Sequence, residues 1–331
     1  MKIIIISSNP YRASFRQRIA VHRDTLRACG IDTELVRFPA DAVARWRLLR
    51  RCNDFDAILL HKRRLNMIDA FCLRRYARCV IYDLDDAVMY SDKNPDRPSR
   101  KRRKSFQRTV KLADMVIAGN SYLAEHTRRF CRNVNIIPTG LDAQAYNLKA
   151  EPEKDGILRL VWIGSKITLK YLAGIKPALE EIGSRFDNVV LRIICDDFFD
   201  LNNLEVEKCL WSSEQEVFDL TTCDIGLAPL PDNRFTKGKC GFKILQYAAS
   251  GLPVVASPVG ANAEYIQDGT NGFYAVDNSD WIEKVSLLLK DSQLRQQMGR
   301  AGRQKVEQFD LKVLGKQLVE LIKGCLVNSE G

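Results

Sequence analysis

The chain lacks several features that would place it in a specialised class of protein. Its 331 residues contain no run of eighteen apolar residues, so no transmembrane helix is predicted. The opening stretch MKIIIISSNPYR has an apolar centre of only four isoleucines, too short for a secretory signal peptide. The ten cysteines stand singly, without a Cys-x-x-Cys pair, which argues against zinc and redox motifs. We therefore expect a cytoplasmic protein with reduced thiols.

Histidine is scarce, and nucleotide-binding fingerprints of the G-x-G-x-x-G or Walker type are missing. Of the three histidines, His61 ends the strand-like run AILLH and is a candidate catalytic residue, with a structural role as the alternative. His22 and His126 lie in helical patterns and are expected to be structural or exposed. The sequence also has no recognisable nucleic-acid reading motif or aromatic stacking platform.

Charge is present in excess but is distributed unevenly. Residues 1–150 carry 30 Lys and Arg against 15 Asp and Glu, whereas the remainder carries 21 against 26. A basic first half suits an anionic substrate, an anionic membrane surface or a nucleic acid. The strongest basic run, RKRRK at 100–104, indicates either a solvated helix face or a surface that docks on anionic lipid.

Apolar runs alternate with helical patterns along the whole chain. Strand-like runs such as KIIIISS, AILLH and CVIYDL alternate with helical patterns in the first half, and LRLVWIG opens a second series. This alternation predicts parallel α/β sheets covered on both faces. A polar stretch with Pro152 and Gly156 separates the two series. The predicted organisation is an acceptor-binding Rossmann-like domain at 1–146, a linker at 147–157, a donor-binding Rossmann-like domain at 158–309 and a C-terminal helix at 310–331, which we expect to pack back on the first domain.

Glycines and lysines gather where strands of the second half are predicted to end. In open α/β sheets ligands bind at these carboxyl ends, and helix N-termini there favour anions. The stretch KGKCGFKILQYAAS places three lysines and two glycines beside a helix start, a pattern that suits a pyrophosphate. The candidate ligand-binding residues are Gly164, Lys166, Lys170, Lys237, Gly238, Gly241, Lys243, Gly260 and Glu264.

These stretches together resemble the group 1 glycosyltransferases. FTKGKCGFKILQYAASGLPVVASPVGANAEYIQDGTNGF resembles the donor-binding signature of that family, and DIGLAPL, LVWIGSKITLKYL, ADMVIAGNSYLAEHT and VNIIPTGLDAQAY are also similar to it. The resemblance is densest over 158–275. It implies the GT-B fold, in which two Rossmann-like domains with parallel sheets face each other across a cleft.

The resemblance also implies roles for individual residues. Gly238 and Gln246 stand where the family usually has two glutamates, and Gln246 remains able to hydrogen-bond ribose hydroxyls. Lys170 matches the family's lysine, whereas Ser165 replaces its arginine. Lys170 and Lys243 would stabilise the charge that grows on the leaving diphosphate, so neither a metal nor a cofactor is expected.

Acidic and basic residues of the first half are candidates for the acceptor side. Asp85 and Asp86 follow a predicted strand, and we expect them to contact the acceptor or the donor sugar, with capping of the next loop as the alternative. A divalent metal at these acids is a further hypothesis. Three arginines follow the first strand where family members bind acceptors, namely Arg12, Arg16 and Arg18, with a solvated helix surface as the alternative.

The sequence thus predicts an enzyme that transfers a sugar from a nucleoside-diphosphate-sugar to an acceptor hydroxyl. The resemblance implies a retaining, metal-independent reaction on a saccharide or lipid-linked acceptor in polysaccharide or lipopolysaccharide synthesis, with peripheral contact to the inner membrane face. The arginines of the acceptor region suit an anionic acceptor. The alternatives are another GT-B activity, a degenerate nucleotide-sugar-binding protein, and a nucleic-acid-binding protein, although no nucleic-acid partner is expected.

Overall fold

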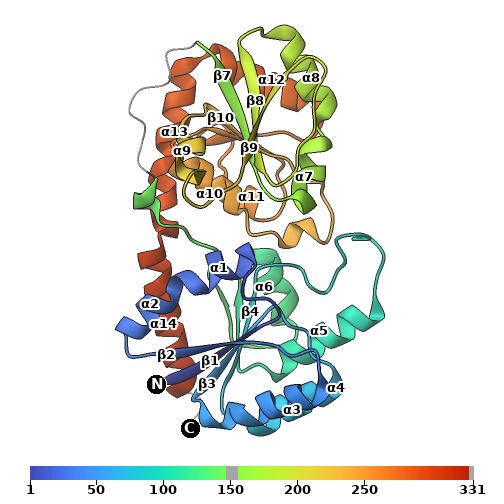
Figure 1. Ribbon diagram of the computed structural model, residues 1–331, viewed down its shortest axis with the longest axis vertical. Helices are drawn as coiled ribbons and strands as arrows, with labels where there is room; N and C mark the ends of the chain where they lie inside the picture. The colour runs from blue at the N-terminus through green and yellow to red at the C-terminus, as the bar shows by residue number, and fades with distance from the viewer. Residues whose placement is uncertain (147–155, 328–331) are drawn as a thin grey trace. The chain divides into compact units, whose positions relative to one another are not determined.

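The computed structural model describes residues 1–146 and 156–327 and divides into two compact units (Figure 1). Unit 1 comprises residues 1–140, 233–240 and 311–331, and unit 2 comprises residues 141–232 and 241–310. The predicted linker at 147–157 lies almost entirely outside the described residues. Two later segments of the chain, 233–240 and 311–331, thus belong to unit 1 together with its first 140 residues.

The described residues of unit 1 form a six-stranded sheet in the order β2-β1-β3-β4-β5-β6, and all neighbouring strands are parallel. The strands are β1 (Lys2–Ser7), β2 (Asp32–Arg37), β3 (Ala57–His61), β4 (Val80–Leu84), β5 (Met115–Ala118) and β6 (Val134–Ile136). Every residue of β3, β4 and β5 is buried, as expected of central strands covered on both faces.

The helices of unit 1 are α1 (Ala13–Arg18), α2 (Arg23–Ala28), α3 (Ala42–Arg51), α4 (Met67–Tyr76), α5 (Arg100–Leu112), α6 (Ser121–Arg128) and α14 (Leu311–Val327). Side chains at the N-caps of α3 to α6 accept a hydrogen bond from the backbone amide three residues further on, so these helices begin where the sequence offers Asp, Asn or Ser. Residues 14–30 have apolar residues at helical spacing, which predicts one helix, but a 3₁₀ turn at Ala20–His22 divides this stretch into α1 and α2.

Helix α14 belongs to unit 1 although it ends the described chain. Its apolar residues, including Leu314, Leu318 and Ile322, share a core cluster with Ile3 and Ile5 of β1. This packing covers one face of the sheet with the last helix.

The described residues of unit 2 form a second six-stranded parallel sheet in the order β12-β11-β10-β7-β8-β9. The strands are β7 (Leu158–Ile163), β8 (Val189–Cys195), β9 (Glu205–Leu210), β10 (Ile225–Ala228), β11 (Val254–Ala256) and β12 (Gly272–Tyr274). Strand β9 escapes prediction because it is a half-exposed edge strand with the polar sequence EVEKCL.

The helices of unit 2 are α7 (Lys166–Ala173), α8 (Lys176–Arg185), α9 (Glu216–Thr221), α10 (Phe242–Ala249), α11 (Ala261–Tyr265), α12 (Asn278–Lys290) and α13 (Ser292–Val306). The helical pattern over 168–185 predicts one helix, but the structure has two, which are separated at Gly174, and the second has Pro177 in its first turn. The short 3₁₀ turns elsewhere are η2 (Cys52–Asp54), η3 (Ala143–Ala145), η4 (Thr236–Gly238) and η5 (Glu307–Phe309).

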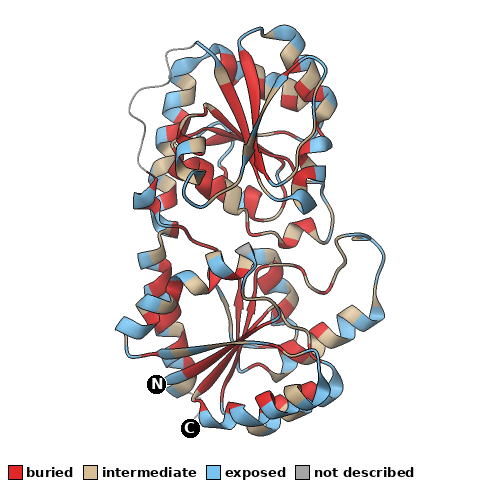
Figure 2. Ribbon diagram, in the orientation of Figure 1, coloured by how far each residue is buried: buried red, intermediate tan, exposed pale blue. Residues whose placement is uncertain are grey.

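Buried residues follow the strands of both sheets and the inward faces of the helices (Figure 2). The predicted fold class, with two parallel α/β sheets flanked by helices, is therefore confirmed. None of the described helices combines the length and the apolar content needed to cross a lipid bilayer.

Candidate functional site

The strand order of unit 2 places a topological switch point between β7 and β10. The chain runs from β7 to β8 and β9 on one side, whereas β10, β11 and β12 lie on the other. Ligands of open α/β sheets bind at the carboxyl ends of strands at such a point. Helices α7, α10 and α11 begin after β7, β10 and β11, so the predicted residues of unit 2 gather at this edge, namely Gly164, Lys166, Lys170, Gly241, Lys243, Gly260 and Glu264.

Gly164, Trp162 and Lys243 form a tight cluster at the end of β7. The Lys243 ammonium lies 4.7 Å from the centre of the Trp162 ring. A Cβ atom on Gly164 would lie 2.4 Å from the Trp162 ring and 2.8 Å from the Lys243 nitrogen. Glycine is therefore the residue that lets the indole and the ammonium group pack against the backbone, and two predicted residues, Gly164 and Lys243, come together here.

Lys166 is already matched to acidic groups of the loop after β8. Its backbone amide donates to Asp196 at 2.6 Å, and its ammonium pairs with Asp197 at 3.0 Å. The hydrogen bond to Asp197 raises the pKa of Lys166. Lys170, one turn further along α7, is exposed and lies 5.1 Å from the centre of the Tyr171 ring. The positive charge of Lys166 is thus balanced by a nearby carboxylate.

The starts of α10 and α11 are fixed by two glycines with positive φ. Gly241 precedes α10 with φ of 59°, and a Cβ there would lie 3.0 Å from the Tyr265 ring. Gly260 precedes α11 with φ of 56°, and Glu264 is exposed on that short helix. Residues that have a side chain rarely adopt a positive φ, so glycine is needed at both positions for α10 and α11 to begin with this backbone geometry.

Gln246 belongs to a hydrogen-bonded cluster that sequence reasoning missed. Its amide nitrogen donates to Glu216 at 2.7 Å, and the same carboxylate accepts from Tyr146 at 2.8 Å and Trp211 at 2.6 Å. Gln246 is only 3% exposed, and Glu216 is half-buried. The sequence carries no signal for this cluster, because Tyr146 lies 70 residues from Glu216.

Lys237 and Gly238 lie in unit 1, apart from the other predicted donor residues, which lie in unit 2. They belong to segment 233–240, which returns to the carboxyl ends of β4 and β5. The Asn120 amide donates to the carbonyl oxygens of Lys237 and Lys239, at 3.0 and 2.9 Å. A Cβ on Gly238 would lie 2.5 Å from the Cβ of Ala87, so no side chain fits there without movement.

Asp85 and Asp86, the predicted acids, lie in a cluster with two lysines. Lys62 pairs with Asp85 at 2.9 Å and also with Asp86, and Lys239 pairs with Asp86 at 3.0 Å. Burial opposes ionisation of Asp86, but the two ammonium groups outweigh it and lower its pKa below the ordinary value. Asp86 is therefore a carboxylate held in its charged form.

Asp83, two residues before Asp85, has both carboxylate oxygens bound by basic side chains. Arg18 donates to both of its oxygens at 2.7 to 3.0 Å, and the His61 Nδ1 atom lies 2.9 Å away. Burial favours the neutral acid, yet Arg18 and His61 lower the pKa of Asp83 to about 2. Arg18 is 4% exposed, so it is part of the interior and not a surface cation.

Lys62 is the residue of unit 1 that sequence reasoning missed most clearly. Among the described residues other than glycine, it alone has a positive φ, 55°. Such a conformation stores strain of about 1 kcal/mol or more, and it directs the ammonium group toward Asp85 and Asp86. Within residues 1–146 and 156–327, no group of three or more His, Cys, Asp or Glu residues is placed to hold a metal ion.

Comparison with known proteins confirms the resemblance. Residues 210–291 match the family model described as group 1 glycosyl transferases. A sucrose synthase of Melioribacter roseus is 33% identical over 90 residues, and the sulfoquinovosyl transferase SQD2 of Arabidopsis thaliana is 36% identical over 75 residues. These matches cover 25% and 21% of this chain, and they span only 11% and 15% of the two relatives.

Solved structures extend the likeness in fold to nearly the whole chain. Anabaena HepE in complex with UDP and glucose has a TM-score of 0.73 at 16% identity, covering 98% of this chain and 100% of its own. WaaG, a glycosyltransferase involved in lipopolysaccharide biosynthesis, has a TM-score of 0.71 at 16% identity, covering 97% and 100%. The predicted GT-B fold is therefore confirmed.

Proposed function

We propose that the chain transfers a sugar from a nucleoside-diphosphate-sugar to a hydroxyl of a saccharide acceptor, because residues 210–291 match the family model of the group 1 glycosyl transferases and the two units have the GT-B fold. The observation that carries this proposal is the Lys243 ammonium packed over Gly164 at the end of β7. A fixed cation at a strand's carboxyl end is suited to a diphosphate.

The proposed chemistry depends on stabilising the leaving diphosphate. Negative charge grows on its oxygens as the bond to the sugar breaks, and a cation already in position stabilises that charge without reorganising. Lys243 and Lys170 supply ammonium groups on α10 and α7. We propose that transfer is metal-independent for this reason and, following the family resemblance, that it retains the anomeric configuration.

The acceptor side is proposed to lie in unit 1. Asp85 and Asp86 would contact the acceptor or the donor sugar at the carboxyl end of β4, where Lys62 forms an ion pair with each of them. The excess of basic residues over 1–150 suits an acceptor with negative charge. WaaG is involved in lipopolysaccharide biosynthesis, and its likeness in fold supports a role of this chain in polysaccharide or lipopolysaccharide synthesis.

Donor binding to the Lys243 variant tests the proposal. UDP-sugars are the first donors to examine, because HepE was solved with UDP and glucose. Loss of a charged hydrogen bond typically removes 1.5–3 kcal/mol, so Lys243→Met should weaken UDP binding by about tenfold to a hundredfold in titration calorimetry. Lys290→Met, an exposed lysine of α12, serves as the control. An unchanged dissociation constant for Lys243→Met would refute the assignment.

A second candidate, nucleotide-sugar binding without catalysis, is favoured by one pair of observations. The amide of Gln246 is engaged by Glu216, and Gly238 has no space for a side chain that could touch the sugar. Release of free UDP from UDP-sugars separates the two functions. An enzyme releases UDP with turnover that an acceptor accelerates, whereas a binding protein returns the donor intact.

A further inference from the structure

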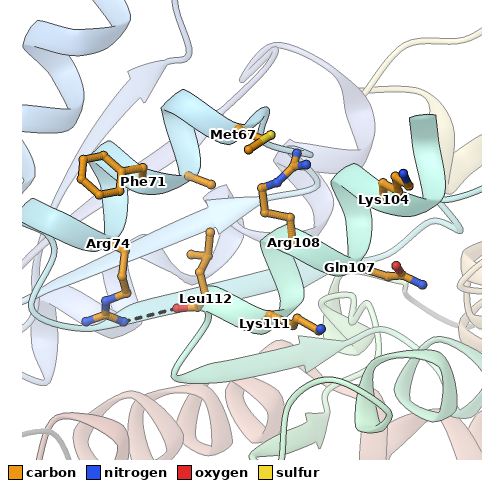
Figure 3. Close-up of a pocket in the computed structure, with 9 residues that line it drawn as sticks. Met67, Phe71, Arg74, Lys104, Gln107, Arg108, Lys111 and Leu112 are labelled. Atoms are coloured by element: carbon orange, nitrogen blue, oxygen red, sulfur yellow. Dashed lines mark hydrogen bonds between the residues drawn. The ribbon is translucent and has the colours of Figure 1, made fainter. Parts of the chain in front are cut away.

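Helices α4 and α5 enclose a groove that the donor and acceptor sites do not use. Its volume is about 600 Å³, and Figure 3 shows the side chains that line it. Met67 and Phe71 come from α4, one turn apart, and Lys104, Arg108 and Lys111 come from α5. The groove therefore has a mainly apolar wall from α4, which also carries Arg74, and a mainly basic wall from α5.

The apolar wall is unusually exposed. Met67, Ile68 and Phe71 are 72%, 74% and 72% exposed, although they follow one another within the first five residues of α4. Isolated exposed apolar residues are ordinary, but a contiguous group beside a groove indicates a binding surface. The buried residues Ala70 and Leu73 already pack α4 against the core, so packing of the core does not require Met67, Ile68 or Phe71.

The basic wall, on α5, carries positive charges that no acidic residue of this helix balances. Helix α5 has the sequence RKRRKSFQRTVKL, with seven basic residues and no acidic one. Arg74 of α4 pairs with Asp114, and Arg108 donates to the carbonyl oxygen of Leu65. Lys104 and Lys111 are exposed at the groove, and Lys111 also lies 5.8 Å from the centre of the Phe130 ring.

We propose that this α4–α5 face docks on a membrane containing anionic lipid. Basic side chains would bind lipid phosphates while Met67, Ile68 and Phe71 enter the boundary between headgroups and acyl chains. Complementarity identifies the partner, since an anionic bilayer offers negatively charged headgroups to the basic side chains and an acyl-chain region to the apolar ones. A nucleic acid would engage the lysines and leave the aliphatic side chains in water. The inference specifies the membrane contact of the proposed function, and its assay is independent of donor binding.

The apolar half of the proposal is tested by co-sedimentation with vesicles. The full chain should bind vesicles of phosphatidylcholine with 30% phosphatidylglycerol, and should not bind pure phosphatidylcholine vesicles. Phe71→Ser should weaken that binding about tenfold, because the ring leaves the lipid phase. Phe218→Ser removes another phenylalanine, 59% exposed on α9, and should leave binding unchanged. Equal loss in both variants, or no loss in either, overturns the proposal.

The basic half is tested with two double variants of equal charge. Lys104→Glu with Lys111→Glu reverses the charge at two positions of the groove. Each lysine near a membrane surface raises the binding constant about fivefold, so vesicle binding should fall at least twentyfold. Lys316→Glu with Lys323→Glu makes the same change at exposed positions of α14. Comparable loss in the two variants would mean a non-specific charge effect. Binding to random DNA that exceeds vesicle binding and is lost in the groove variant, or self-association lost with Phe71→Ser, would assign the face to another partner.

Discussion

Gly164 positions a charged group by having no side chain. The Trp162 indole and the Lys243 ammonium occupy the space where its Cβ would stand. The ammonium therefore rests against the backbone at the end of β7, within reach of a ligand at the switch point. The glycine turn and the lysine were each recognisable in the sequence, but their contact was not, because 79 positions separate them.

Gly164→Ala should displace that pair. The added methyl group would lie 2.4 Å from Trp162 and 2.8 Å from Lys243, so one of them must move. We expect UDP binding to weaken about tenfold and the free energy of unfolding to fall by about 1–3 kcal/mol, as for an overpacked core. Gly324→Ala, where the methyl group meets no atom within 4 Å, is the control. Calorimetric titration and denaturant unfolding measure the two effects; a variant that binds UDP like the parent would disprove the role of Gly164.

Segment 233–240 is the element whose position differs most from the sequence interpretation. Its glycine and lysines read as one phosphate-binding run with Gly241 and Lys243, yet 233–240 packs in unit 1. The Cys240 thiol donates to the carbonyl oxygen of Asp85 at 3.2 Å across 155 residues of sequence. Burial raises the pKa of that thiol to about 12, so it stays neutral beside the carboxylates.

Gly238→Glu, which restores the residue usual in the family, should destabilise unit 1 and not improve catalysis. The Cβ would lie 2.5 Å from the Ala87 Cβ and 2.6 Å from its backbone nitrogen. Displacing the segment breaks the two hydrogen bonds from Asn120 and the pair between Lys239 and Asp86. We expect a loss of about 2 kcal/mol or more in denaturant unfolding, with Gly324→Glu unaffected. Faster UDP release by a stable Gly238→Glu protein would contradict this.

At the scale of the whole molecule, the sequence predicts the features that a local pattern of apolar residues determines, namely the central strands and the helices between them. Buried strands such as β3 and β4 have continuous apolar runs, and both sheets follow from their alternation with helices. Edge strand β9 has no such run, because one side of an edge strand faces water. The clusters around Glu216 and Lys62 could not be predicted, because each joins residues from distant parts of the chain whose types also suit a solvated surface.

Stability should depend on pH through His22, a buried residue that contacts the last helix. A Cβ on Gly315 of α14 would lie 3.3 Å from its Nδ1 atom. Burial and the nearby charge of Arg18 lower the pKa of His22 to about 4. The unfolded chain takes up this proton near pH 6.5 and the folded chain only near pH 4, so acidification between those values favours unfolding. Asp83, with a pKa of about 2, adds its own loss only below about pH 4.

The free energy of unfolding should therefore fall by about 2 kcal/mol from this residue alone between pH 7 and pH 4.5. His22→Leu cannot take up the proton, so its unfolding free energy should decline less over the same interval by that amount. Denaturant titrations of both proteins at half-unit pH steps give the two curves. If the curves run parallel from pH 7 to pH 4.5, His22 is not the group that couples folding of unit 1 to pH. If the parent's curve falls more steeply than the variant's toward pH 4.5, the neutral histidine beside α14 is the cause.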